Sequence, residues 1–270
     1  MSNVGSDSPD LAENYDRVSN SQFEKGLMLA DRMGIGEGAF ILDIGCGTGR
    51  LALYLSKAVG PSGRIDGIDP SPHRIDIANN HLKDLPFHNV HFSIGNAEDL
   101  GSFSDGAFDH AYYSSVFHWV GDKKLALREA YRVLKPGGKV GMTTIDRDNL
   151  RSVRAIAIKI LSRPPYAGQI IRGNSASKPV GKGELEILLA DAGFQDIVVE
   201  VISNKRYYQS PKKLLEFYEA SSFGNFLGAV PDDLRPALRQ DIEDELEKRR
   251  TNAGIELLSN MIFAIATKPS

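Results

Sequence analysis

The chain has 270 residues, with 35 acidic and 32 basic side chains and a net charge of −3. This length is enough for one α/β domain with a lid or for a small two-domain chain. A nearly neutral chain without a basic stripe disfavours nucleic acid as a partner. The single cysteine, Cys46, excludes an internal disulfide and a Cys/His zinc set, so we expect no metal and a reducing, cytoplasmic location. The polar N-terminus and the lack of a long apolar run predict neither a secretion signal nor a membrane span.

Residues 1–35 are predicted to form an N-terminal arm that ends in a helix. The first 12 or so residues have the polar composition of a disordered segment. From Asn14 to Met33, apolar residues recur at helical spacing, with Phe23 and Leu27 on one side. Tyr15 and Gln22 are the polar members of this helix that we single out.

A strand, a glycine-rich loop and a helix follow. Phe40–Ile44 is an apolar run, glycines stand at positions 45, 47 and 49, and a helical pattern begins directly afterwards. Glycines allow the backbone to approach a ligand, and Asp69, 20 residues after Gly49, can accept hydrogen bonds from ribose hydroxyls. The unit therefore predicts a nucleoside-containing ligand. A dinucleotide motif would need glycine where Arg50 stands, and the Lys-Ser/Thr end of a phosphate-binding loop is missing.

Further strands and helices are predicted in the same order. Ser71 is a good helix N-cap, and Pro72 suits the first helical position after it. The remaining predicted elements are a third strand at Val90–Ile94, a fourth strand and its loop within Ala107–Val120, a fifth strand at Lys139–Ile145, a helix at Gly183–Ala192, a sixth strand at Phe194–Ile202 and a last strand at Asn260–Lys268.

Together these elements resemble the class I S-adenosylmethionine-dependent methyltransferases. Asp43-Ile-Gly-Cys-Gly-Thr-Gly49 has the form of that family's first motif, and the later elements follow in the family's order. The resemblance implies a doubly wound, Rossmann-like α/β fold with seven mostly parallel strands, a central first strand and an antiparallel last strand. It also implies S-adenosylmethionine as cofactor and S-adenosylhomocysteine as product.

The resemblance further implies which residues bind the cofactor. The glycine loop would hold the methionine end, Asp69 the ribose and Asn96 the adenine, although the family usually has aspartate there. An amide can still meet the adenine amino group through its oxygen. The N-terminal helix would lie over the cofactor. The expected set is Tyr15, Asp43, Gly45, Cys46, Gly47, Gly49, Asp69, Asn96, Ala97, Glu98 and Ser114, with packing alone as the alternative for Tyr15 and a solvated loop acid as the alternative for Glu98.

The same resemblance places the reaction at the carboxyl end of the fourth strand, where Ser114, Ser115, His118 and Trp119 stand. Val116–Val120 also resembles the small carboxylate O-methyltransferases. His118 is the candidate catalytic residue, as a base or as a donor to a substrate oxygen, and a packed loop histidine is the alternative. Gln22, His118, Trp119 and Tyr166 are the candidate substrate-binding residues, with a core role as the alternative for Trp119.

Two lid insertions, near 147–180 and 203–255, are expected within a methyltransferase domain that spans 36–270. An aromatic, closable pocket suits a small, partly apolar acceptor. The aromatic residues that the lid would contribute are Tyr166, Tyr207, Tyr208, Phe217, Tyr218, Phe223 and Phe226.

The sequence therefore predicts methyl transfer to a small, partly apolar molecule, at the oxygen of a carboxylate or hydroxyl. Such a displacement depends mostly on holding the two reactants in line. The alternatives are a C-methyltransferase for a quinone-, polyketide- or isoprenoid-like acceptor and a cofactor-binding protein without turnover. The oligomeric state does not follow from the sequence.

Overall fold

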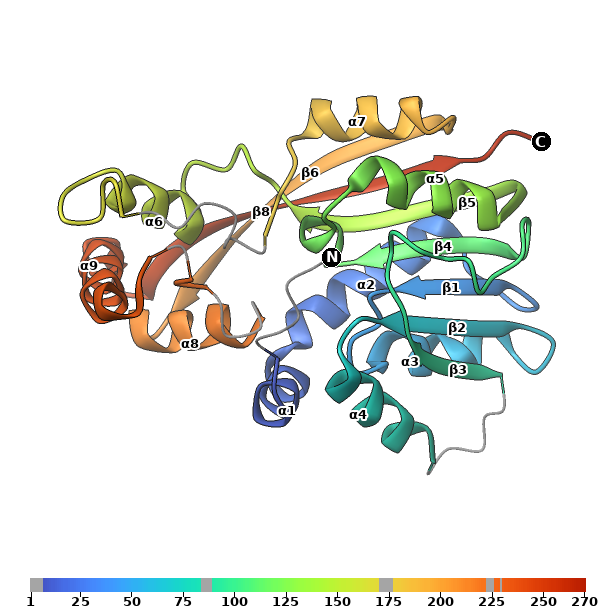
Figure 1. The fold of residues 1–270 in the computed structure, drawn as a ribbon, viewed down its shortest axis with the longest axis horizontal. Helices are drawn as coiled ribbons and strands as arrows, with labels where there is room; N and C mark the ends of the chain where they lie inside the picture. The colour runs from blue at the N-terminus through green and yellow to red at the C-terminus, as the bar shows by residue number, and fades with distance from the viewer. Residues whose placement is uncertain (1–6, 84–88, 170–176, 222–225, 229) are drawn as a thin grey trace.

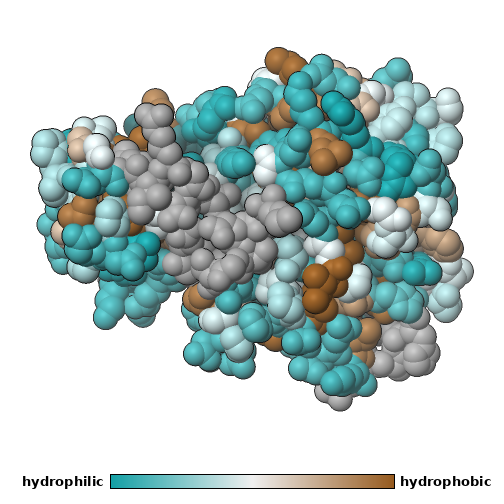
Figure 2. Space-filling model, in the orientation of Figure 1, coloured by the Kyte–Doolittle hydropathy of each residue, from teal (hydrophilic) through white to brown (hydrophobic). Residues whose placement is uncertain are grey.

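The computed structural model describes residues 7–83, 89–169, 177–221, 226–228 and 230–270. On the face shown in Figure 2, hydrophobic residues are scattered among hydrophilic ones. In these described ranges, no helix combines the length and the apolar composition needed to cross a bilayer.

The fold is one twisted sheet with helices on both faces (Figure 1). Its strand order is β3-β2-β1-β4-β5-β8-β6, and β7 pairs with β8 beside this path. Only β8 runs against its neighbours, β5 and β6, while all other pairs on the main path are parallel. The predicted seven-stranded sheet, its antiparallel last strand and the interior position of the first strand are confirmed. The strands are β1 (Phe40–Ile44), β2 (Arg64–Asp69), β3 (Val90–Ile94), β4 (Phe108–Ser114), β5 (Leu134–Ile145), β6 (Gln195–Tyr208), β7 (Arg250–Thr251) and β8 (Gly254–Thr267).

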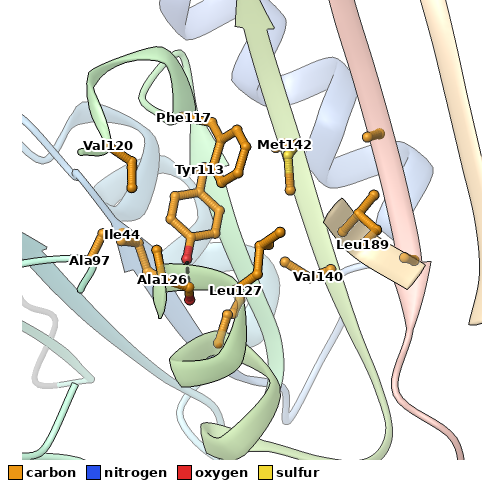
Figure 3. Packing of buried hydrophobic residues seen from close by; sticks show 14 of the residues in the cluster. Ile44, Ala97, Tyr113, Phe117, Val120, Ala126, Leu127, Val140, Met142 and Leu189 are labelled. Atoms are coloured by element: carbon orange, nitrogen blue, oxygen red, sulfur yellow. Dashed lines mark hydrogen bonds between the residues drawn. The ribbon is translucent and has the colours of Figure 1, made fainter. Parts of the chain in front are cut away.

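Successive side chains of a strand point to opposite faces of the sheet, so each face buries every second residue. On one face, α5 and α7 share a hydrophobic core with Leu42 and Ile44 of β1, and the Tyr113 hydroxyl donates to the Ala126 carbonyl at 3.1 Å (Figure 3). On the other face, α2, α3 and α4 pack over Ile41 and Ile65. The helices are α1 (Pro9–Val18), α2 (Asn20–Met33), α3 (Arg50–Val59), α4 (Pro72–Lys83), α5 (Lys123–Val133), α6 (Val153–Leu161), α7 (Lys182–Asp191), α8 (Pro211–Ser221) and α9 (Arg235–Glu247).

Strand order reverses between β1 and β4, because β2 and β3 lie on one side and β5 on the other. At such a switch point, the loops at the carboxyl ends of neighbouring strands diverge and leave a crevice. The glycine loop after β1 and the loop after β4 both open into it.

The last two long strands extend well beyond this crevice, which corrects the predicted bounds. β5 pairs with β8 only as far as Ile145 with Met261, whereas β6 and β8 continue to pair until Tyr208 and Ile255. The polar run at 203–207 hid this extension, since a strand with both faces half exposed has no clear alternation. The projecting parts of β6 and β8 carry α6, α8 and α9, and the three helices share a hydrophobic core with these strands (Figure 1). This substructure is called the lid below.

The N-terminal helix was predicted as one unit and is two. It breaks at Ser19, and α1 begins at Pro9, inside the segment expected to be disordered. The Ser8 hydroxyl accepts from the Leu11 N–H at 3.3 Å, so Ser8-Pro9 is the same kind of start signal as Ser71-Pro72. Leu29 of α2 belongs to the sheet's own core, and the division of the chain at residue 35 stays a prediction.

Candidate functional site

The glycine loop is fixed to the second strand by backbone hydrogen bonds. The N–H groups of Gly45 and Cys46 donate to the Ile68 carbonyl at 2.7 and 2.9 Å. Gly45 has φ of 80°, and an added Cβ would lie 2.4 Å from a methyl carbon of Val116. A side chain here is therefore excluded both by backbone conformation and by the loop after β4.

Asp69 closes this loop against the start of α4. Its Oδ2 accepts from the Gly47 N–H at 3.0 Å and its Oδ1 from the Ser71 N–H at 2.9 Å. Burial raises the pKa of Asp69, while nearby Arg74 and the two backbone donors act in the opposite direction. Asp69 lines a cavity, together with Gly45 and Gly47. The structure thus brings together the glycine loop and the acid that the sequence singled out.

The N-terminal arm covers this part of the cavity. The Tyr15 ring lies against Gly47, within 3.4 Å of the position of an added Cβ, and the Arg74 guanidinium lies 4.2 Å from the centre of that ring. Arg74 also forms an ion pair with Asp7 at 3.0 Å. Asp16 accepts from the Thr48 hydroxyl at 2.6 Å and so holds α1 on the loop. Tyr15 therefore lines the cavity as expected, and Arg74 is a wall residue that the sequence analysis did not single out.

Asn96, Ala97 and Glu98 form the opposite wall. Asn96 and Glu98 are joined by two hydrogen bonds of 3.3 Å. The Asn96 side-chain amide donates to the Glu98 carboxylate, and the Glu98 N–H donates to Asn96 Oδ1. Glu98 also accepts from the Asp122 N–H at 2.6 Å. Although burial alone would raise it, the pKa of Glu98 is lowered, because the Asp122 N–H and other donors stabilise the carboxylate. Glu98 is thus anchored to the loop before α5.

Three members of the expected cofactor set lie behind the cavity wall instead of on it. Cys46 has a buried thiol whose pKa is raised well above its ordinary value, chiefly by burial. An added Cβ at Gly49 would meet the Phe92 ring at 2.5 Å, so this glycine is needed for packing against β3. Asp43 is buried beneath the loop, and its Oδ2 accepts from the Tyr112 hydroxyl at 2.9 Å.

Asp43 has an unusual ionisation. Burial raises its pKa to about 7, the Tyr112 hydroxyl opposes this by stabilising the carboxylate, and the Asp69 charge adds to the increase. The second oxygen, Oδ1, is buried and has no hydrogen-bond partner in the described part of the chain. A nearby cation would lower this pKa and stabilise the carboxylate.

At the end of β4, the structure places Ser115 on the wall and Ser114 outside it. Ser114 lies beside α2, where its hydroxyl is 2.9 Å from the position of an added Cβ on Gly26. Ser115 has φ of 61°, and its N–H donates to the Thr143 hydroxyl at 2.9 Å. This turn redirects the chain, so strand alternation alone could not show which serine faces the cavity.

His118 and Trp119 follow in a short 3₁₀ turn and both line the cavity. The His118 ring is 4% exposed, and its Nδ1 lies 3.2 Å from the Thr144 hydroxyl. Burial, followed by the charges of Lys123, Arg154 and Lys25, lowers the pKa of His118 to about 3. His118 is therefore neutral at physiological pH.

The cavity continues from the glycine loop to the lid and has a volume of about 530 Å³, in the range of small-molecule sites. The predicted Gln22 and Trp119 line it, as do Phe217, Tyr218 and Phe226 among the expected lid aromatics. Apolar side chains from α6 and β8 complete this half: Ala157, Ile158, Leu161, Leu258 and Met261.

Tyr166 was expected to contact substrate, and the structure places it elsewhere. Its ring is 2% exposed within the lid core, and its hydroxyl donates to Asp241 of α9 at 2.6 Å. This hydrogen bond joins the turn after α6 to α9 and explains why a tyrosine is buried there. Tyr207 and Tyr208 do not line the cavity either, and Phe223 lies outside the described residues.

The donor set fits an adenosine-based cofactor with a cationic methionine end. Buried oxygens without a partner in the described ranges include Asp43 Oδ1, Gln22 Oε1 and Ser115 Oγ. Buried polar atoms are normally paired, so these oxygens indicate a polar ligand. Gly45 and Gly47, both with positive φ, provide the close backbone approach. In the described ranges, no cluster of three His, Cys, Asp or Glu residues is arranged to hold a metal.

Comparisons with known proteins agree with this geometry. Residues 35–193 match the family model of the methyltransferase domain. The demethylmenaquinone methyltransferase of Staphylococcus aureus is 31% identical over 205 residues, which cover 70% of this chain and 83% of that protein.

Solved structures share the fold. The YcgJ protein of Bacillus subtilis superposes with a TM-score of 0.65 at 18% identity, over 93% of this chain and 99% of that one. Phosphoethanolamine N-methyltransferase 2 of Haemonchus contortus, solved with phosphomonomethylethanolamine and S-adenosylhomocysteine, superposes with a TM-score of 0.59 at 21% identity, over 92% of this chain and 53% of that one.

We expect Asp69→Ala to weaken S-adenosylmethionine binding by roughly 1.5–3 kcal/mol, because the ribose would lose a charged acceptor. Asp66→Ala is the matched control. Asp66 lies on the same strand, is buried and forms an ion pair with Arg64 at 2.7 Å, and neither residue lines the cavity. Calorimetric titration measures both dissociation constants. Equal constants for the wild type and Asp69→Ala would remove Asp69 from the binding site.

Binding of S-adenosylhomocysteine, which keeps the cationic amino group, should release a proton from Asp43. At pH 6 a carboxyl group with a pKa of about 7 is mostly protonated, and a cation bound nearby favours its ionised form. Most of a proton should thus be released at pH 6 and less at pH 7.5, and the affinity should rise with pH between these values. Calorimetry in two buffers of different ionisation enthalpy counts the protons. Asp43→Asn should abolish the release, and an unchanged proton count in that variant would contradict the assignment.

Proposed function

The chain belongs to the class I S-adenosylmethionine-dependent methyltransferases, and we propose that it methylates an oxygen of a small, largely apolar molecule. The observation that carries this proposal is the cavity itself. One end is built from Gly45, Gly47 and Asp69, and the other from apolar side chains of α6, α8 and β8. A single cavity thus suits the cofactor at one end and an acceptor of limited size at the other.

The chemistry needs little from the protein beyond alignment. In the displacement, an acceptor oxygen bonds to the methyl carbon while the carbon–sulfur bond breaks and leaves its electron pair on a neutral sulfur. An acceptor that is already ionised needs no base. His118, with a pKa of about 3, is poorly matched to take a proton at neutral pH. We therefore propose that His118, oriented by Thr144, positions the acceptor, and that Trp119 and Gln22 contact it.

A carbon acceptor is the second candidate, because a relative of 31% identity bears the name demethylmenaquinone methyltransferase. A quinone-like ring would also suit the apolar lid. As part of the same proposal, the substrate is a free small molecule instead of nucleic acid, and the protein works in the cytoplasm, where the single thiol of Cys46 stays reduced.

The decisive assay follows label from methyl-tritiated cofactor into a metabolite extract, a protein fraction and RNA in parallel. We expect label in the metabolite fraction and, if the product is a carboxylate ester, its release as methanol on mild alkaline treatment. Base-stable label on an aromatic ring would favour the carbon acceptor. Label confined to protein or RNA would overturn the small-molecule assignment. If the protein binds the cofactor but transfers no label to any fraction, a cofactor-binding protein without turnover would be favoured.

His118→Gln tests the positioning role. Because His118 stays neutral from pH 6 to 8, we expect the variant to raise KM for the acceptor while its kcat/KM follows the same pH dependence as the wild type. His110→Gln is the control, since His110 lies on the neighbouring strand β4 and does not line the cavity. A loss of ~10²–10⁴ in kcat that varies with pH would instead identify a general base.

A further inference from the structure

Two cations, Lys25 and Arg154, line the acceptor half of the cavity. Lys25 projects from α2 and Arg154 from the first turn of α6, so the sheet domain and the lid contribute one each. Both side chains are half-buried. Neither forms a salt bridge or a hydrogen bond with any residue in the described part of the chain. A half-buried cation without a partner is costly, so such a pair needs a reason to be there.

The third cation of the cavity shows the contrast. Arg74, at the cofactor end, forms an ion pair with Asp7 at 3.0 Å and stacks on Tyr15, so its charge is already used within the protein. Lys25 has only the charge of Glu24 acting against its lowered pKa, without an ion pair between them, and no acid contributes to the pKa of Arg154. Their charges are therefore available to a ligand.

These two charges are desolvated and line one cavity. Burial, together with the neighbouring charge of Arg206, lowers the pKa of Lys25 to about 8, and burial alone lowers the pKa of Arg154. Both cations line the same cavity as His118, and both contribute to the low pKa of that ring. The lid half thus has a positive end next to the residue proposed to position the acceptor.

The charges of the cavity are divided between its two ends. The acids Asp69 and Glu98 line the cofactor end, where a cationic ligand is favoured. Lys25 and Arg154 stand among apolar residues such as Leu161 and Phe217 at the other end. Attraction between opposite charges is stronger in such a setting than in water. A ligand for this end should therefore combine an apolar body with a single anionic group.

We propose that Lys25 and Arg154 together bind the carboxylate of the acceptor, so that the substrate is a small, apolar carboxylic acid. This rests on the proposed oxygen methylation and narrows it. A carboxylate offers two oxygens in one plane, which match the fork of an arginine, and a lysine can bind either oxygen as a point charge. A carboxylate is ionised at neutral pH and agrees with a site whose histidine is not a base. Methylation removes its charge, so the ester loses the attraction of both cations and leaves more easily than the acid.

The test uses the full chain saturated with S-adenosylhomocysteine and three probes that share one apolar body: octanoate, octanamide and octyl phosphate. Calorimetry should show octanoate binding more tightly than octanamide, a comparison that needs no variant. Arg154→Met and Lys25→Met should each weaken octanoate binding by ~10- to 100-fold and leave octanamide nearly unchanged. Arg151→Met and Lys212→Met, which remove exposed cations outside the cavity, are the matched controls and should leave both affinities unchanged.

The outcomes separate this inference from the function on which it rests. Equal binding of octanoate and octanamide, or an octanoate preference that survives in both Met variants, would overturn the carboxylate site. Tighter binding of octyl phosphate than of octanoate would overturn the carboxylate in favour of a phosphate ester. In each of these cases the methyltransferase assignment stands as long as S-adenosylhomocysteine binds. Failure of S-adenosylhomocysteine to bind the wild type would instead remove the proposed function, whatever the probes show.

Discussion

The Asp69 carboxylate connects the parts of the site, because each of its oxygens accepts from a different backbone segment. The Gly47 N–H reaches it only because the glycine loop adopts positive φ, and the Ser71 N–H reaches it at the start of α4. One buried side chain therefore fixes the loop after β1 relative to the turn after β2. The N-terminal arm closes on the same place, since Arg74 joins Asp7 to Tyr15 above the loop. The Asp69 carboxylate thus joins the loop to the turn, and the bond between Asp16 and Thr48 holds the arm on the same loop.

Much of the sheet domain could be predicted because its signals are local. A buried run, a glycine loop and the Ser71-Pro72 cap each carry their own physical reason within a few residues. Ser8-Pro9 has the same meaning and was hidden by the polar composition around it. The projection of β6 and β8 could not be predicted in this way. Residues 203–208 are in a strand because they pair with 255–260, and that pairing joins segments about fifty positions apart.

The same difference between local signals and contacts between distant segments applies to the site. The glycines at 45 and 47, Asp69, Asn96 and the 118–119 turn could be found from motifs, because the strand ends bring them together. Ser115 lines the cavity instead of Ser114, because the positive φ of Ser115 redirects the chain. Tyr166 was misplaced because its partner, Asp241, stands 75 positions away, and Lys25 and Arg154 had no motif at all. Their meaning comes from burial without a partner, which is a tertiary property.

The packing of the lid explains how the two halves of the cavity can have different roles. Helices α6, α8 and α9 share a hydrophobic core with the projecting parts of β6 and β8, and this core is separate from the two cores that lie against the rest of the sheet. Side chains facing the cavity from α6, such as Arg154 and Leu161, can therefore differ without disturbing the glycine loop or Asp69. The cofactor half is constrained by backbone hydrogen bonds, which no change in the lid removes. The lid side of the proposed acceptor end thus belongs to a unit that is held by its own packing, while Lys25, His118 and the glycine loop belong to the sheet domain.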